Sequence, residues 1–296
     1  MKEYENRVLI YGAGVIGSLY AVKLSACGCN VAVLARGSRL KELQEKGLLY
    51  YENGIKEARV RVISEITDQD KFDYIFLTVR AEQVITALEA LRRNKSSTII
   101  TMVNTLEKYQ NWENTAGKGR ILPAFPGAGG SIENGILNAK LTPAIIQPTT
   151  FGEINGKKTD RVKQLKKLFA AAKVPVQIVP DMHVWQVCHL AMVVPLADAY
   201  YQAGKAPERV AWDKNSMKIT AKRLKRNFNL LGQKGICLSP GKMKLICFLP
   251  VPLLACLLKY VYKSDFGNMF MYQHAMKAKE EMKLLHRDFY KYLKVH

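Results

Sequence analysis

The pattern Gly-x-Gly-x-x-Gly at residues 12–17 constrains the fold of this chain more than any other feature, because apolar strand-like runs lie on either side of it. Residues 8–11 form a short apolar run typical of a strand buried on both faces. The first glycine permits a tight turn, the second lets a phosphate group approach the backbone, and the third lets a helix lie close to the strand. A second apolar run at 31–35 follows the helix that Gly28 ends. The pattern predicts a nucleotide-binding βαβ unit whose phosphate loop comprises Gly12, Ala13, Gly14, Val15, Ile16 and Gly17.

The residue after the second strand indicates which dinucleotide is bound. An acidic side chain at this point would accept hydrogen bonds from the ribose of NAD, whereas a cation accommodates the additional phosphate of NADP. The sequence here is Leu34-Ala35-Arg36-Gly37-Ser38-Arg39, without an acid. Arg36 offers a planar fork to a phosphate, Ser38 a hydroxyl and Arg39 a second charge, so the sequence predicts NADP(H) rather than NAD(H). The alternative is that these cations are solvated loop residues.

Further apolar runs extend the predicted parallel sheet. Each strand at 74–79 and 98–103 is followed by a polar residue, Arg80 and Asn104 respectively. Because ligands bind beyond the carboxyl ends of strands in open parallel sheets, both residues should share the rim of the glycine loop. We also expect strands at 57–63, 121–125, 137–151 and 174–179, helices at 40–46, 84–91 and 160–173, and a loop at 126–130.

A domain boundary is expected at Pro180-Asp181, because no convincing strand follows it. Residues 1–180 would form a Rossmann-type α/β domain, and residues 181–296 an all-helical domain. Helices are expected at 183–202, with a bend at Pro195, and at 209–234 and 266–294. The apolar segment 245–258 is interrupted by two prolines and is shorter than the ~20 residues that span a bilayer. Its burial in the helical domain or at a subunit contact is favoured over membrane docking.

The composition excludes few classes of protein, but the positive net charge indicates which kinds of molecule the chain binds. The formal net charge is +20, from 45 Lys and Arg against 25 Asp and Glu. The cations are spread through helical segments without a recognised nucleic-acid module, so we expect anionic small molecules as partners and no nucleic acid. The six cysteines show no zinc pattern, and the charged N-terminus leads directly into the first strand. We therefore expect no metal, no signal peptide, and free thiols in the cytoplasm.

The chain resembles the ketopantoate reductase family through the glycine loop, Ala35-Arg36-Gly37, Thr78-Val79-Arg80, Val103-Asn104 and Gly152-Glu153. The resemblance covers residues 7–179 and continues weakly beyond. It implies a Rossmann domain followed by an all-helical domain like that of 6-phosphogluconate dehydrogenase, and reduction of a 2-oxo acid with NADPH. It also implies that Asn104 lies near the nicotinamide and substrate, and that Arg80 replaces a lysine near the cofactor. A homodimer through the helical domain is compatible with it.

Departures from the family pattern affect the chemistry. The family's general acid is a lysine two residues after a tryptophan, with an asparagine on the same helical face. Here Trp185 is followed at these positions by Val187 and Ala191. A ketone that accepts hydride needs a proton, and a general acid contributes about 10²–10⁴-fold to the rate. The candidate donors are His189, one helical turn after Trp185, and His274. Glu280 and Glu281 lie near the position of a substrate-contacting glutamate of the family, and Glu281 is taken as the match.

Three hypotheses follow from this combination. The first is an NADPH-dependent oxidoreductase that reduces a small 2-oxo acid or related carbonyl other than ketopantoate. The second is a non-catalytic NADP(H)-binding sensor or partner protein, because the family's lysine and asparagine are both missing. The third is a peripheral membrane protein that uses the segment 245–258, helped by Lys242, Lys244, Lys259 and Lys263. The first is favoured.

Overall fold

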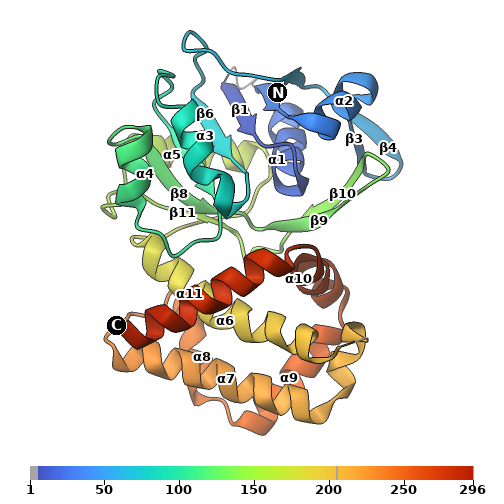
Figure 1. Cartoon of the computed structure of the whole chain (residues 1–296), viewed down its shortest axis with the longest axis vertical. Helices are drawn as coiled ribbons and strands as arrows, with labels where there is room; N and C mark the ends of the chain where they lie inside the picture. The colour runs from blue at the N-terminus through green and yellow to red at the C-terminus, as the bar shows by residue number, and fades with distance from the viewer. Residues whose placement is uncertain (1–5, 205, 296) are drawn as a thin grey trace. The chain divides into compact units, whose positions relative to one another are not determined.

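The computed structural model describes residues 6–204 and 206–295, except for the side chains of His274 and Val295. The chain divides into two compact units, residues 1–182 and residues 183–296 (Figure 1). The first contains all the described strands and the second is built from helices. The fold is therefore a mixed α/β arrangement with a helical C-terminal region.

The main sheet of the first unit has eight strands in the order β12-β11-β8-β7-β6-β1-β2-β5. All neighbouring pairs are parallel except β11 and β8. The four residues of β6 and those of β7 are all buried, which explains why both runs are almost entirely apolar. In spatial order the bounds are β12 (Val176–Ile178), β11 (Thr149–Phe151), β8 (Ile121–Phe125), β7 (Ile99–Met102), β6 (Tyr74–Leu77), β1 (Arg7–Tyr11), β2 (Asn30–Leu34) and β5 (Arg61–Ile63).

The predicted βαβ unit is present as β1, α1 (Val15–Ala26) and β2. Its helix begins directly after Gly14 and ends before Cys27 and Gly28, where the φ angle of +97° at Gly28 suits glycine. Tyr20, on α1, is fully buried and its hydroxyl lies 2.5 Å from the Thr149 hydroxyl of β11. Helix α1 therefore packs across the sheet and fixes the position of the glycine loop.

A second, four-stranded sheet packs against the outer side of α1 and was not predicted. Its strands lie in the order β4 (Ile55–Ala58), β3 (Leu48–Tyr51), β10 (Ile136–Leu141) and β9 (Ala128–Glu133). The predicted single strand at 57–63 is wrong, because it is divided between β4 in this sheet and β5 in the main sheet. The predicted loop at 126–130 is also partly wrong, since β9 begins at Ala128. Because Gly130 has no Cβ, β9 can lie close to β10 at this point; a Cβ there would overlap the backbone of Ala139 on β10.

The remaining helices of the first unit are short. Helix α4 was not predicted from the sequence, and α2 begins three residues earlier than expected. Their bounds are α2 (Gly37–Lys46), the 3₁₀ turn η1 (Ala81–Gln83), α3 (Val84–Ala90), α4 (Tyr109–Ala116) and α5 (Asp160–Ala171). Gly47 ends α2 with a φ of +72°, as its position after the last helical residue indicated.

The helical unit follows the predicted order of helices but with more interruptions. Pro195 lies inside the long helix α6, and the predicted single helix at 266–294 is divided into a π-helical turn and two α-helices. The bounds are α6 (Met182–Gln202), η2 (Pro207–Trp212), α7 (Lys214–Gln233), η3 (Gly241–Met243), α8 (Lys244–Phe248), α9 (Val251–Lys263), η4 (Gly267–Tyr272), α10 (Gln273–Lys277) and α11 (Lys279–Val295). Among the described residues, no helix has the length and apolar character needed to cross a membrane.

Candidate active site

The parallel pairing brings the ends of four strands to one edge of the main sheet. Tyr11 of β1 is in register with Leu34 of β2 and Leu77 of β6, and Leu77 is in register with Thr101 of β7. The chain leaves the sheet just beyond these positions, so the glycine loop, Arg36, Arg80 and Asn104 all follow strands that end at this edge. This is the edge at which open parallel sheets bind their ligands.

The three glycines of the loop meet different steric demands. Gly12 has a φ of +115°, a conformation that side chains other than glycine rarely adopt. A Cβ on Gly17 would overlap the carbonyl oxygen of Gly12, so this glycine is required for α1 to lie against the loop. A Cβ on Gly14, by contrast, would meet nothing within 4 Å. The backbone at Gly14 is therefore open to a ligand, as the predicted phosphate contact requires.

Two side chains from outside the loop hold it in place. The Thr78 hydroxyl, just after β6, donates to the carbonyl oxygen of Gly12 over 2.8 Å. Arg39, on α2, donates from Nε to the carbonyl oxygen of Ala13 over 3.2 Å, and its Nη1 contacts the carboxylate of Glu42. Arg39 was expected to offer a second charge to a phosphate, whereas its guanidinium contacts the loop and Glu42.

Arg36 is exposed and lies directly after the last residues of the β2 run. Its Nη2 donates to the Tyr11 hydroxyl over 3.0 Å, and its guanidinium carbon lies 5.9 Å from the centre of the Tyr11 ring. Within the described residues it forms no ion pair with a carboxylate. Tyr11 thus orients a cation that keeps most of its donors available for an anion at the rim.

Arg80 and Asn104 differ in their surroundings. The Arg80 side chain is exposed, and its backbone begins the turn η1. Asn104 is buried, and its Oδ1 has no hydrogen-bond partner among the residues that the structure describes. A buried amide oxygen without a partner costs stability, which makes it a candidate contact for a bound group.

The helical unit carries the other predicted site residues. His189, on α6, is buried, and its ring stacks on the Trp185 ring with centroids 5.1 Å apart and an angle of 8° between the planes. The predicted sharing of one helical face by these two residues is therefore present. Val187 and Ala191, at the positions of the family's lysine and asparagine, are both fully buried and apolar.

The two acidic residues at the start of α11 are not equivalent. Glu280 is exposed and its carboxylate lies 2.7 Å from the Lys283 Nζ. Glu281 is partly buried, which favours it over Glu280 as the functional carboxylate. The side chain of His274, on α10, lies outside the described residues.

The Gly152-Glu153 pair is a structural feature of the first unit. The carboxylate of the buried Glu153 accepts from the Arg161 Nε over 2.7 Å, and also from Arg161 Nη2 and the Thr159 hydroxyl. Burial raises the pKa of this carboxyl, but the hydrogen bonds from Arg161 and Thr159 and the Arg161 charge outweigh it, so the pKa lies below its ordinary value. Arg161 also donates to the carbonyl oxygens of Gly119 and Ile121. This network joins α5 to the start of β8.

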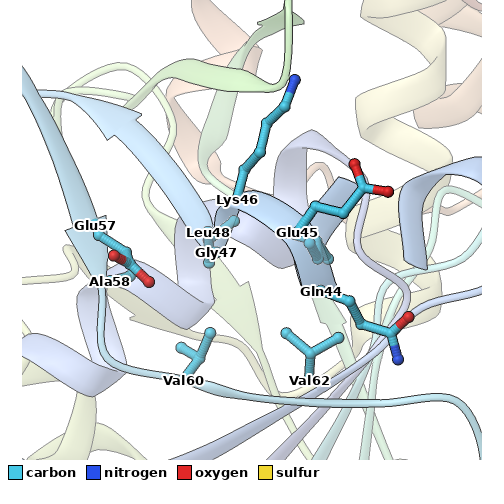
Figure 2. A pocket seen from close by; sticks show the side chains of 10 residues that line it. Gln44, Glu45, Lys46, Gly47, Leu48, Glu57, Ala58, Val60 and Val62 are labelled. Atoms are coloured by element: carbon cyan, nitrogen blue, oxygen red, sulfur yellow. The ribbon is translucent and has the colours of Figure 1, made fainter. Parts of the chain in front are cut away.

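A surface pocket of about 480 Å³ lies elsewhere in the first unit, between the end of α2 and the strands β4 and β5 (Figure 2). Its lining includes Glu45, Lys46 and Glu57 but none of the predicted site residues. Among the described residues, no group of three or more His, Cys, Asp or Glu could hold a metal ion.

Comparison with known proteins places this geometry in a family. The family described as Ketopantoate reductase PanE/ApbA matches residues 8–156. A 2-dehydropantoate 2-reductase of Mesorhizobium japonicum is 28% identical over 137 residues, which cover 45% of this chain and 38% of that protein. The match thus spans well under half of the length of this relative.

Solved structures share the fold over nearly the whole chain. The crystal structure of 2-dehydropantoate 2-reductase from Geobacter metallireducens GS-15 has a TM-score of 0.67 at 16% identity, covering 96% of this chain and 99% of that one. A D-mandelate dehydrogenase in complex with NADH has a TM-score of 0.66 at 14% identity, covering 98% and 99%. At these identities the likeness concerns the fold.

Proposed function

Because the chain belongs to the ketopantoate reductase family PanE/ApbA, we propose that it is an NADP-dependent oxidoreductase that reduces a small 2-oxo acid or related carbonyl. The observation that carries this proposal is the intact dinucleotide loop beside the unpaired, buried Oδ1 of Asn104. The residues 1–180 would bind the cofactor, and the residues 181–296 would supply substrate contacts and a dimer interface.

The residues at the sheet edge fit a nicotinamide dinucleotide. The backbone at Gly14 is open, the N-terminus of α1 would face the pyrophosphate, and Asn104 would give its amide to the nicotinamide or the substrate. Arg36 supports NADP(H) over NAD(H), because its exposed guanidinium is held by Tyr11 and has no acidic partner in the described chain. Arg80 would add a fixed positive charge for an anion, and it cannot donate a proton at neutral pH.

When bound, the cofactor supplies the hydride for reduction of the carbonyl. The chain must supply the proton, and the family's lysine is replaced by the buried Val187. We assign this role to an imidazole, either His189, whose ring is oriented by Trp185, or His274. Glu281 would contact the substrate. The altered acid site argues for a substrate other than ketopantoate.

The test is the consumption of NADPH by the purified chain with ketopantoate and with a panel of other 2-oxo acids, beside NADH controls. We expect turnover of at least one acid other than ketopantoate, with NADPH preferred. Turnover of ketopantoate at an ordinary enzymatic rate would mean that another group replaces the lysine and that the substrate proposal is wrong.

A second candidate is a non-catalytic NADP(H)-binding protein that acts as a sensor or partner subunit. It is favoured by one observation: the two positions that carry the family's lysine and asparagine are both filled by buried apolar side chains. It predicts NADPH binding without turnover of any acid in the panel, and a partner affinity that differs between the cofactor-free and cofactor-bound protein. Turnover of any of these acids would reject it.

A further inference from the structure

The exposed large apolar side chains of the helical unit lie on a few of its elements. In the described part of residues 183–296, every large hydrophobic side chain that is exposed lies on η2, α8 or α9. Phe248 is 81% exposed, Tyr260 69% and Trp212 67%, and the others are Leu245, Leu253, Leu257 and Val261. We name these seven residues the apolar patch.

Four residues of the apolar patch lie on α9, and the inner face of this helix is packed. Leu254, Leu258 and Tyr262 of α9 are buried, while Leu253, Leu257 and Tyr260 lie on the opposite side at helical spacing. Burial of the segment 245–258 in the helical unit or at a subunit contact was expected. Of this segment, only the inner face of α9 is buried within the helical unit. Monomeric proteins rarely leave such a cluster of aromatic and aliphatic side chains in water without a function.

Lysines lie in and around the elements that carry the apolar patch. Between residues 214 and 264 the sequence has eleven Lys and Arg and no Asp or Glu, while the exposed Glu208, Asp213 and Asp265 lie just outside this range. Lys263 Nζ lies 3.3 Å from the centre of the Trp212 ring, and Lys259 Nζ lies 5.9 Å from it. Lys242 and Lys244 precede Leu245 and are exposed. The cations therefore border the same surface as the apolar side chains.

The combination of apolar and basic side chains indicates which kind of partner binds this surface. A second copy of the chain, placed symmetrically on this face, would bring one basic border against another, which is repulsive. Nucleic acid would match the charge but would leave Leu253, Leu257 and Phe248 without apolar contacts. An anionic bilayer surface satisfies both, because aromatic and aliphatic side chains enter the interface while lysines extend to the headgroups.

We propose that α8, α9 and Trp212 form a docking surface for membranes that contain anionic phospholipids. Phe248 and Leu245 on α8 enter the headgroup region together with the outer face of α9. Lys225 of α7 fixes the end of α8, because its Nζ donates to the carbonyl oxygen of Cys247 over 2.7 Å and to that of Leu249. The proposal goes beyond the proposed reaction and does not depend on it.

The experiment is co-sedimentation of the full chain with vesicles of phosphatidylcholine alone and with vesicles of phosphatidylcholine and phosphatidylserine in equal parts, at low and high salt. We expect binding to the mixed vesicles at low salt and a decrease at high salt. Phe248→Ser should decrease binding at least about fivefold, and Lys242→Glu with Lys244→Glu at least about tenfold. Ile145→Ser is the matched control, because Ile145 is 84% exposed in the other unit and should not affect binding.

An unchanged far-UV circular dichroism spectrum and an unchanged Tm show that a variant is folded, so a folding defect is distinguishable from a lost surface. Absence of binding to the mixed vesicles at low salt overturns the proposal. So does equal binding by the wild-type chain and the Phe248→Ser variant. A dimer in lipid-free solution that Phe248→Ser dissociates would instead assign the surface to a second copy. Binding to a single-stranded oligonucleotide that competes with the vesicles and does not depend on Phe248 would assign it to nucleic acid.

Discussion

Arg39 of α2 donates a hydrogen bond from Nε to the carbonyl oxygen of Ala13, which lies inside the glycine loop, over 3.2 Å. Glu42, one helical turn later, contacts Nη1 of the same guanidinium. The second helix of the chain thus helps to fix the conformation of a loop that precedes the first. Arg36, at the same edge, differs from Arg39 in its contacts, because it is exposed and its Nη2 donates to the Tyr11 hydroxyl.

Arg39→Gln should weaken the binding of NADPH and NADH to a similar extent. The variant loses a charge-assisted contact to the loop, so about a tenfold increase in each Kd is expected. Titration of the purified protein with each cofactor, followed by cofactor fluorescence, measures both values. Lys41→Gln, at an exposed position of the same helix, is the control. Unchanged Kd values in Arg39→Gln would show that the loop holds its conformation without this contact.

Arg36→Ala should weaken NADPH binding by about 10- to 100-fold, because charge-assisted hydrogen bonds to the additional phosphate are lost. NADH binding should change little, in contrast to the effect of Arg39→Gln. The same titrations measure the ratio of the two Kd values. Equal affinity of the wild-type chain for the two cofactors, or an unchanged ratio in the variant, contradicts a phosphate-binding role for Arg36.

The βαβ unit was predictable because its determinants are local. Gly12 and Gly17 occupy positions where a Cβ is sterically excluded, and β6 and β7 are buried on both faces, so their sequences are almost entirely apolar. The second sheet was not predictable in this way. Its pairing of β3 with β10 joins residues far apart in the sequence, and Gly130 in β9 indicated a loop because its close contact with Ala139 is a tertiary feature.

The supporting residues of the site were missed for a similar reason. Thr78 was read only as part of a strand end, and nothing in its neighbourhood in the sequence indicates a hydrogen bond to Gly12. Arg39 was expected to bind a phosphate. Its contact with Ala13 joins residues 26 positions apart, which local sequence patterns do not reveal. Residue type and spacing indicated which side chains reach the sheet edge, whereas their partners depend on packing.

Asn104→Leu should leave the cofactor-free protein as stable as the wild type or stabilise it by about 1 kcal/mol, because it removes a buried oxygen that has no partner in the described chain. Turnover of the accepted 2-oxo acid should fall, since the amide would no longer contact the nicotinamide or substrate. Thermal unfolding and steady-state kinetics measure the two effects. A clear decrease in Tm together with unchanged kcat would indicate that Asn104 is a structural residue only.

His189→Ala or His274→Ala should lower kcat by about 10²–10⁴-fold if the replaced imidazole is the proton donor. NADPH binding should survive, because the cofactor residues lie in the first unit. His286→Ala is the control: its Nδ1 lies 3.0 Å from Asp198 Oδ1 on α6, an ion-pair position outside the predicted site. Full rates in both single variants would place the proton donor elsewhere.

Glu153→Gln should lower the free energy of unfolding at pH 7 by about 3 kcal/mol, because Arg161 would lose its charged partner in a largely buried network. The pKa of Glu153 lies below its ordinary value of 4.5 in the folded chain, so its stabilising contribution is complete above that pH and is lost as the pH falls through the folded-state pKa. The difference between wild type and variant should therefore shrink in acid. Urea unfolding at several pH values measures this convergence.

Asp160→Asn is the control for that series. The exposed Asp160 pairs with the exposed Lys163 over 3.0 Å, and such surface pairs contribute at most about 1 kcal/mol. Its substitution should change stability little at any pH, although it also removes the acidic side chain from the first turn of α5. A Glu153→Gln effect as small as that of Asp160→Asn at pH 7, or one that grows as the pH falls, would mean that the charge of Glu153 does not stabilise the connection between α5 and β8.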